Sequence, residues 1–421
     1  MKISILTVGS TGDVLPYVAL GKELVSAGHT VTLGAHARFK QTAEVGGVGF
    51  FSVEGDPQAV LEGEAGRKWL ETRNPVSYLR GMVKASEPFL RSMLDSFIEA
   101  CEDTELILFH ILAAFPAVSI AEKMGVKSVS TYLTHVHPTW SYPNVLAMPC
   151  PKGGKIYNRM TYPPVAWLYW HLLRSNVNRW RAEKLGLPPW SFRGPLNQWL
   201  KERRPCIYGF SRHVIPRPPE WGPEVHLTGN WVSEPDQGWV PPDGLTRFLE
   251  SGSPPVFVGF GSMIDRHPRE LSEIVVRALD LAGARGVLGT GWGAIEAGTL
   301  SSTVHAIREI PHDWLFPRMA AVVHHGGAGT TASALRAGVP SVVVPYFGDQ
   351  HFWGSRVADL GAGPAPLPRH KLSAEGLAEA IRNAVETAEY RRRASGLGVA
   401  LRAECGTRNA VEVIHRLVEG A

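Results

Sequence analysis

Residues 324–331 read His-His-Gly-Gly-Ala-Gly-Thr-Thr, and this stretch decides the fold of the second half of the chain. Four apolar residues, Ala320 to Val323, precede it as a short buried strand, and a helical pattern resumes from Thr331 to Ala337. Strand, glycine-rich turn and helix form a layout that suits a phosphate group, because backbone N–H groups and the positive end of the helix dipole meet there. His325 could add a directed donor. Many α/β proteins have such a turn without a ligand, and the motif alone leaves that alternative open.

Strands and helices alternate along the first half of the chain. The expected strands are residues 3–8, 30–34, 106–109 and 128–133, and the expected helices are 15–27, 76–100 and 117–124. This alternation predicts a parallel sheet covered by helices on both faces. Ligands of such sheets gather at the carboxyl ends of the strands. The turn from Gly9 to Asp13, which includes Gly12, follows a predicted strand, as do His110, His135 and His137.

A chain of 421 residues is too long for one ordinary core and suits two domains. Residues 1–215 form the first α/β series. Residues 216–242 are dense in Pro, Gly and Trp, which is typical of a linker. A second series follows over 243–405, with a strand at 256–259 and a helix at 268–281. The amphipathic helix within 406–421 is expected to pack back on the first domain.

Composition excludes several classes of function. A net charge of +4 with 19% charged residues indicates no nucleic-acid partner, and Arg391-Arg392-Arg393 is best interpreted as a solvated helix face. The four cysteines lie far apart without zinc-ligand spacing, which favours a reducing cytoplasm. No apolar run approaches the roughly 18 to 20 residues of a membrane span, so no stable membrane insertion is expected.

The first turn, Gly9-Ser10-Thr11-Gly12-Asp13, could be mistaken for a dinucleotide fingerprint. It lacks the third glycine, and the second strand ends in Gly34-Ala35-His36 where an acidic ribose-binding residue is expected. An NAD-dependent oxidoreductase is therefore a weaker alternative.

The glycine-rich motif, followed by Phe347-Gly348-Asp349-Gln350, resembles the donor-binding signature of nucleotide-sugar glycosyltransferases of the GT-B fold, which have two facing Rossmann-like domains with a cleft between them. The resemblance is closest to the sterol glucosyltransferase-like and natural-product branch. It rests on four blocks in the right order, which are residues 9–21, 178–189, 311–316 and 347–354. It implies that the nucleotide diphosphate is held by His325, Gly327, Ala328, Gly329 and Thr330. Asp349 and Gln350 would then bind sugar hydroxyls.

The same resemblance makes Asp13 the catalytic base, because Gly12-Asp13-Val14-Leu15-Pro16 is similar to the carboxylate-bearing branch of the family. A free Asp has a pKa of about 3.9, so we expect it to accept the proton late in a concerted step. Ser262 and the His325 region would stabilise the leaving group. His110 could be a second base or could orient Asp13. Asp13 as a mere first-turn helix acid, and His110 as a core residue, are the alternatives.

Recognition of the nucleotide base is expected near Ile310 and His312, with Trp292 as another stacking candidate. The resemblance does not separate UDP from dTDP, although UDP-glucose is the first expectation and a dTDP-sugar the second. No Asp-x-Asp motif occurs in the chain, so we expect neither a metal nor a cofactor beyond the nucleotide sugar.

Residues 139–204 interrupt the alternation with a Trp- and Tyr-rich segment. One interpretation is an apolar wall for a lipophilic acceptor, formed by Trp140, Trp170, His135 and His137 with Gly12, which could also contact a membrane surface peripherally. The other is an aromatic helix packed in the core. Two histidines without a nearby Cys or carboxylate are a weak metal signal.

The expected function is inverting transfer of a hexose, with glucose favoured, from a nucleotide sugar to a hydroxyl of a sterol, polyketide, macrolide or phenolic acceptor, by a monomer or homodimer. A nucleotide-sugar epimerase of the same fold is the main alternative, but it would need no apolar acceptor pocket. A binding protein without activity would be expected to lose Asp13 or His325, and both are present.

Overall fold

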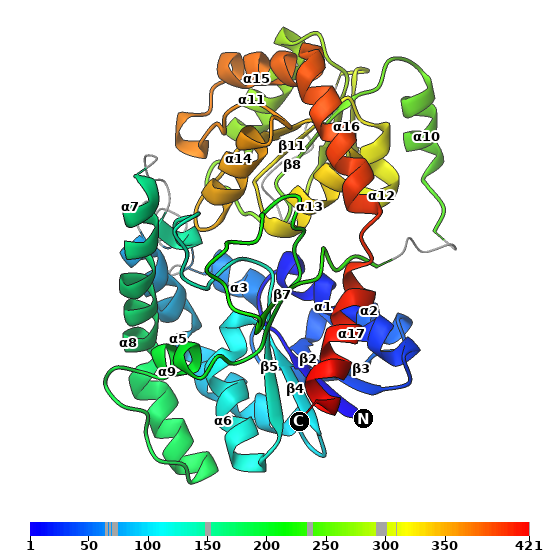
Figure 1. Cartoon of the computed structure of the whole chain (residues 1–421). Helices are drawn as coiled ribbons and strands as arrows, with labels where there is room; N and C mark the ends of the chain where they lie inside the picture. Colours follow the sequence, from blue (N-terminus) through cyan, green and yellow to red (C-terminus); the bar gives the residue numbers. More distant parts are fainter. Residues whose placement is uncertain are drawn as a thin grey trace. The chain divides into compact units, whose positions relative to one another are not determined.

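The computed structural model describes residues 1–63, 66, 69, 75–147, 153–233, 239–291, 301–308 and 310–420. The contacts divide the chain into two compact units (Figure 1). Unit 1 comprises Met1–Ser233 with Cys405–Ala421, and unit 2 comprises Glu234–Glu404.

The sheet of unit 1 has seven parallel strands in the order β3-β2-β1-β4-β5-β6-β7. The strands are β1 (Lys2–Leu6), β2 (Thr30–His36), β3 (Gly49–Val53), β4 (Leu106–Phe109), β5 (Lys127–Tyr132), β6 (Cys206–Tyr208) and β7 (Val225–Leu227). The chain starts in the middle of the sheet, builds outward to β3, and then returns to the other side of β1. The strand order therefore reverses between β1 and β4, which is the point where open α/β sheets bind ligands.

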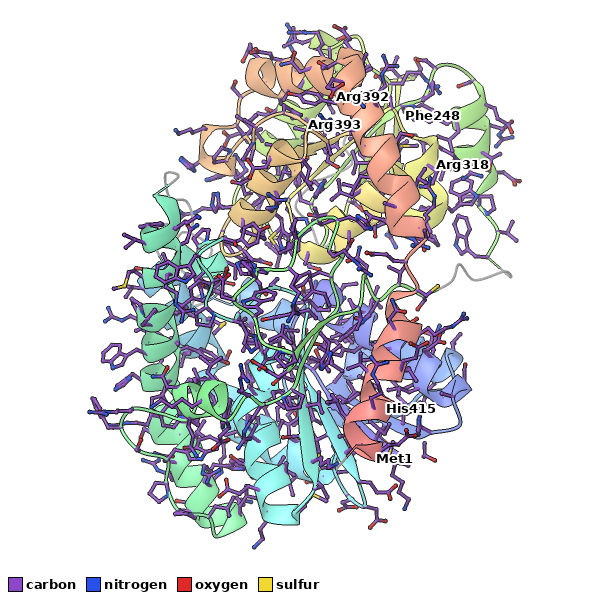
Figure 2. All side chains as sticks on the ribbon, in the orientation of Figure 1. Met1, Phe248, Arg318, Arg392, Arg393 and His415 are labelled. Atoms are coloured by element: carbon purple, nitrogen blue, oxygen red, sulfur yellow. The ribbon has the colours of Figure 1, made fainter. Side chains whose placement is uncertain are left out.

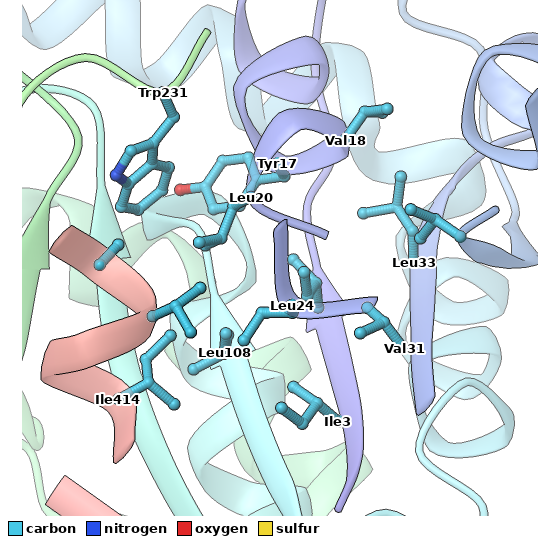
Figure 3. Close-up of a cluster of buried hydrophobic side chains, with 14 of the residues drawn as sticks. Ile3, Tyr17, Val18, Leu20, Leu24, Val31, Leu33, Leu108, Trp231 and Ile414 are labelled. Atoms are coloured by element: carbon cyan, nitrogen blue, oxygen red, sulfur yellow. The ribbon is translucent and has the colours of Figure 1, made fainter. Parts of the chain in front are cut away.

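Helices cover both faces of this sheet (Figure 1). The described α-helices of unit 1 are α1 (Thr11–Ser26), α2 (Lys40–Val45), α3 (Pro57–Glu62), α5 (Pro75–Glu99), α6 (Ala114–Met124), α7 (Gly154–Met160), α8 (Tyr162–Trp180), α9 (Leu196–Lys201) and α17 (Gly406–Glu419). The last helix, α17, packs against α1 and adds Ile414 to the core formed with Leu24 and Leu108 (Figure 3). The His29 ring further links the residue before β1 to α17, since it contacts the Met1 amino group and the His415 ring. Met1 and His415 are labelled in Figure 2.

Unit 2 has five parallel strands in the order β10-β9-β8-β11-β12, with the reversal between β8 and β11. The strands are β8 (Val256–Gly259), β9 (Gly286–Gly289), β10 (Val304–Ile307), β11 (Ala321–His324) and β12 (Ser341–Val343). The helices are α10 (Asp243–Glu250), α11 (Pro268–Leu281), α12 (His312–Leu315), α13 (Ala328–Ala337), α14 (Gln350–Asp359), α15 (Ala374–Glu386) and α16 (Ala388–Arg402).

The predicted fold class, two parallel α/β domains, is confirmed. The boundary differs from the prediction, because residues 216–233 belong to unit 1 and contribute β7 where we expected a linker. A strand of three residues among prolines carries too little alternation to be recognised in the sequence. Arg392 and Arg393 do lie on an exposed helix face, where both bind Glu389 (Figure 2).

The aromatic segment folds mainly into α7, α8 and a single π-helical turn, Arg181–Leu185. The Arg181 guanidinium is buried; it donates to Ser119 Oγ at 2.8 Å and Glu122 Oε2 at 3.0 Å, and it lies 3.8 Å from the centre of the Trp190 ring. The side-chain amide of Asn178 donates to Trp190 O and accepts from Trp190 N. The block 178–189, one of the four that carry the family resemblance, therefore has a structural role within unit 1. Among the described helices, none has the length and hydropathy needed to cross a membrane.

Candidate active site

Asp13 lies in the first turn of α1, directly after β1 at the reversal point of the first sheet. Its Oδ2 accepts hydrogen bonds from Ser10 N at 2.8 Å and Ser10 Oγ at 2.9 Å. Gly9 has φ +127°, and a Cβ there would lie 2.5 Å from Oδ2, so only glycine fits beside the carboxylate. The helix begins at Thr11 rather than near Leu15 as predicted, because Ser10 and Asp13 cap each other.

The second oxygen of Asp13, Oδ1, faces His110. Its distance to His110 Nε2 is 3.9 Å, and the Asp13 side chain is 35% exposed. Oδ1 accepts no hydrogen bond from any described residue. His110 follows β4, the strand beside β1, so the two residues meet because their strands are neighbours. Burial lowers the pKa of His110, and the Asp13 carboxylate opposes part of that shift.

His36, which the sequence analysis did not single out as a site residue, ends β2 on the other side of β1. It is buried, and its Nδ1 lies 3.3 Å from Val53 O. Burial lowers the pKa of His36, and the charges of Asp56 and Asp13 act in the opposite direction. The sequence feature that could have identified His36 as a site residue is its position at the carboxyl end of a strand next to β1.

The residues predicted to contact the acceptor divide into buried and exposed ones. His135 is fully buried with Nε2 at 2.9 Å from Pro143 O, and His137 Nδ1 lies 2.6 Å from the Tyr208 hydroxyl. Burial lowers the pKa of His137 to about 4, so its ring is neutral. Trp170 is 1% exposed and donates to Phe192 O, which favours packing over ligand contact. Trp140 is 43% exposed.

In unit 2 the equivalent position is the turn between β11 and α13. Gly327 precedes the helix without any side-chain cap, and the first turn contains no acidic residue. The backbone N–H groups of Ala328, Gly329 and Thr330 have no acceptor among the described residues. Three uncompensated donors at the positive end of a helix attract an anion.

His325 lies between the glycines of two turns. A Cβ at Gly327 would be 2.4 Å from His325 Nε2, and one at Gly261 would be 3.0 Å from its Cε1. Burial, with a smaller contribution from His312, lowers the pKa of His325 to about 4. Its ring is therefore neutral near pH 7 and can donate one hydrogen bond. Burial also lowers the pKa of His324 to about 3 and of His312 to about 4.

Ser262 lies in the turn after β8, next to β11 in the sheet, and is 8% exposed. Two side chains from later in the sequence, Gln350 and Arg369, contact residues of this turn. Gln350 accepts from Tyr346 N at 2.8 Å and donates to Met263 Sδ at 3.3 Å, so its amide joins the turns after β8 and β12. Asp349 Oδ2 accepts from Trp353 Nε1 at 3.0 Å. In this structure both predicted sugar-binding side chains make contacts within the protein.

A buried ion pair fixes the same turn and was not foreseen. Arg369 donates to both carboxylate oxygens of Asp265, at 2.7 and 3.0 Å, and Asp265 also accepts from His267 N. The partners are 104 residues apart, so no local signal could have identified them.

The predicted base-binding residues are only partly described. Ile310 precedes α12 and packs against the core of unit 2, and His312 stacks on Phe316 at 4.2 Å between ring centres. Trp292 lies outside the described residues. Within the described ranges, no three His, Cys, Asp or Glu side chains gather as a metal site would require.

Two family models match the chain. Residues 3–135 match the glycosyltransferase family 28 N-terminal domain, and residues 294–419 match the erythromycin biosynthesis protein CIII-like C-terminal domain. A sterol 3-beta-glucosyltransferase of Arabidopsis thaliana is 35% identical over 99% of this chain and 68% of its own length. One from Aspergillus fumigatus is 33% identical over the whole chain, which spans 30% of that longer protein.

Solved structures agree on the fold. The kitacinnamycin glycosyltransferase superposes with a TM-score of 0.71 at 20% identity, over 99% of this chain and 98% of the other. The calicheamicin glycosyltransferase CalG4 gives 0.68 at 18% identity, over 100% and 99%. With the site geometry and the sequence relatives, these matches show that the chain is a glycosyltransferase of the GT-B fold and belongs to the family of the sterol 3-beta-glucosyltransferases.

Proposed function

We propose that this glycosyltransferase transfers a hexose from a nucleotide diphosphate sugar to a hydroxyl of a lipophilic small molecule, with inversion at the anomeric carbon. Glucose is the expected sugar and a sterol the first acceptor class, because several relatives are named sterol 3-beta-glucosyltransferases. UDP-glucose is the first donor to test. A thymidine diphosphate sugar is the second, since a structural neighbour was solved with thymidine diphosphate.

The observation that carries this proposal is that the two carboxylate oxygens of Asp13 have different surroundings. Ser10 holds Oδ2, whereas Oδ1 faces His110 Nε2 at 3.9 Å. An acceptor oxygen about 2.8 Å from each of these atoms fits that separation with ordinary hydrogen-bond lengths. Such an oxygen would give its proton to Oδ1 while His110 orients it. The helix-capping role of Asp13 is compatible with this, because it uses the other oxygen.

The donor half of the proposal rests on the start of α13. Hydrogen-bond donors for a diphosphate would come from its free N–H groups, the neutral His325 and the nearby Ser262. The first turn of α13 carries no carboxylate that would repel the diphosphate. These donors would stabilise the negative charge that develops as the nucleotide leaves. We therefore expect activity without an added divalent metal.

The reaction then balances in one step. The acceptor oxygen forms a bond to the anomeric carbon as the bond from that carbon to the diphosphate oxygen breaks. The acceptor proton moves to Asp13 Oδ1, and the bonding pair leaves with the diphosphate. Attack opposite the leaving group converts an α-linked donor into a β-glycoside.

Product analysis tests this proposal. Wild-type protein is incubated with EDTA, UDP-glucose or dTDP-glucose, and cholesterol or a macrolide; we expect a β-glycoside by NMR. Epimerised sugar nucleotide without a glycoside would favour the epimerase alternative. Asp13→Asn should abolish most of the product, and Asp243→Asn, which alters an exposed first-turn carboxylate of α10, is the matched control.

A further inference from the structure

Exposed apolar side chains gather on one side of α7 and α8. Ile156 is 74% exposed, Met160 62%, Trp167 53% and Phe192 60%. We call these four residues the α7–α8 patch. Large apolar side chains exposed singly are ordinary, but a contiguous group rimmed by charges indicates a binding surface.

The helix geometry makes the patch continuous. Thr161 separates α7 from α8 yet keeps helical dihedrals, so the two helices follow each other almost without a break (Figure 1). Ile156, Met160 and Trp167 are spaced by four and seven residues and fall on one stripe. His171 continues the stripe: it stacks on Trp167 at 4.0 Å between ring centres and contacts Phe192 at 4.5 Å.

Charge is distributed unevenly around this stripe. Residues 139–201 contain nine Lys and Arg, of which Arg181 and Lys184 pair with acidic side chains outside the segment, and a single acidic residue, Glu183, whereas the whole chain has a net charge of only +4. Arg174 lies 4.9 Å from the Phe192 ring centre and Arg159 lies 5.8 Å from that of Trp140. Lys155 and Arg193 are exposed and form no ion pair with any described residue.

The acidic groups nearby are engaged elsewhere. Glu183 binds Arg91 at 2.7 Å. Glu220 approaches the Trp140 end of the segment, where it accepts hydrogen bonds from Thr139 Oγ1 and Trp140 N. The stripe itself thus presents aromatic and aliphatic groups with cations beside them, which is the chemistry of a surface that lies on an anionic bilayer.

We propose that the α7–α8 patch docks unit 1 on the surface of an anionic lipid membrane, with Trp167 and Phe192 entering the headgroup region and Lys155, Arg159, Arg174 and Arg193 facing lipid phosphates. This deepens the proposed function, because a lipophilic acceptor dissolved in a membrane would then be near the domain that carries Asp13. The helices lie on the bilayer and do not cross it.

Vesicle flotation of the full chain, without nucleotide or acceptor, tests the docking. Wild-type protein should float with phosphatidylglycerol-containing vesicles and bind phosphatidylcholine vesicles more weakly. The pair Trp167→Ser with Phe192→Ser should reduce binding at least about tenfold. Lys155→Gln with Arg193→Gln should remove most of the preference for anionic lipid. Val45→Ser, which alters a 75% exposed valine on α2, is the matched control.

Unchanged thermal unfolding and nucleotide binding would show that the variants fold. Equal flotation of wild type and the Trp167→Ser, Phe192→Ser variant would overturn the proposal. So would a dimer in sedimentation that the same substitutions dissociate, because the patch would then join two copies of this chain. Since no turnover is measured, loss of docking and failure of the proposed transfer reaction are distinguishable.

Discussion

The two sheets reverse their strand order at equivalent places, and a helix begins at each of them. The first turn of one helix has a side-chain cap, and the first turn of the other has none. In unit 1, Ser10-Thr11-Gly12-Asp13 leads into α1, and in unit 2, Gly327-Ala328-Gly329-Thr330 leads into α13. The two stretches correspond position by position, with glycine at the second helical residue of each. Asp13 and Thr330 both occupy the third.

The residue at this third helical position decides whether the helix start can attract an external anion. The Asp13 carboxylate already compensates the positive end of α1, so a second anion there would meet a negative charge. Thr330 leaves the N–H groups of α13 open to an external anion. The same edge of the same fold is thus suited to a proton acceptor in one unit and to a diphosphate in the other.

Asp13→Asn should have the largest effect, because it removes the only carboxylate among the described residues at the first reversal point while preserving the helix cap. We expect turnover to fall by about 10²- to 10⁴-fold, the usual contribution of a general base. Initial rates with saturating donor and acceptor measure this. Turnover within a few-fold of wild type would remove Asp13 from catalysis.

Thr330→Asp would make the start of α13 resemble that of α1. The new carboxylate should repel a diphosphate, and we expect donor affinity to fall by about 100-fold, or roughly 3 kcal/mol, as one charged group is opposed in a partly buried site. Calorimetric titration measures the change. Thr407→Asp on α17 is the control, and full retention of affinity by Thr330→Asp would place the diphosphate elsewhere.

Acid should destabilise unit 2 through its histidines. The pKa values of His325 and His312 are lowered to about 4 in the folded protein, from about 6.5 when unfolded. The unfolded state therefore binds protons first, and stability is complete above pH 6.5 and declines as the pH falls toward 4. Each side chain should cost about 2 kcal/mol at pH 5. Urea unfolding at pH 7 and pH 5 measures this, and His325→Gln should lessen the difference.

Ser10→Ala should have the smallest effect of these changes. It removes the hydroxyl donor to Asp13 Oδ2 but keeps the Ser10 N–H donor. We expect a loss of about 1 kcal/mol in stability and a change of only a few-fold in turnover. A loss as large as that of Asp13→Asn would mean that the cap, rather than the free oxygen, governs activity.

Much of the fold was readable from local patterns. The strands at 106–109 and 256–259 and the helix at 268–281 have the predicted bounds, because apolar runs, glycines and Pro268 delimit them. The strands β6 and β7 were missed, since three residues carry no usable period. The start of α1 was misjudged because it depends on a reciprocal cap and not on apolar spacing.

The candidate site was predictable as far as strand order could be inferred. Asp13 and His110 meet because β1 and β4 are neighbours, and His325 and Ser262 follow neighbouring strands in the same way. What the sequence could not indicate is how the side chains are used. The amide of Gln350 is engaged by Tyr346 and Met263, and Asp265 pairs with a distant arginine. Such pairings depend on tertiary contacts.

Calorimetric titration with UDP and with dTDP, in the presence of EDTA, tests the central claim most directly. The claim is that the base lies at the reversal point of unit 1 and that the diphosphate binds at the reversal point of unit 2. We expect wild type and Asp13→Asn to bind one of these nucleotides with equal affinity, and His325→Ala to bind it at least about tenfold more weakly. Loss of binding in Asp13→Asn, or unaltered affinity in His325→Ala, would contradict the assignment of the diphosphate to α13 and of the base to α1.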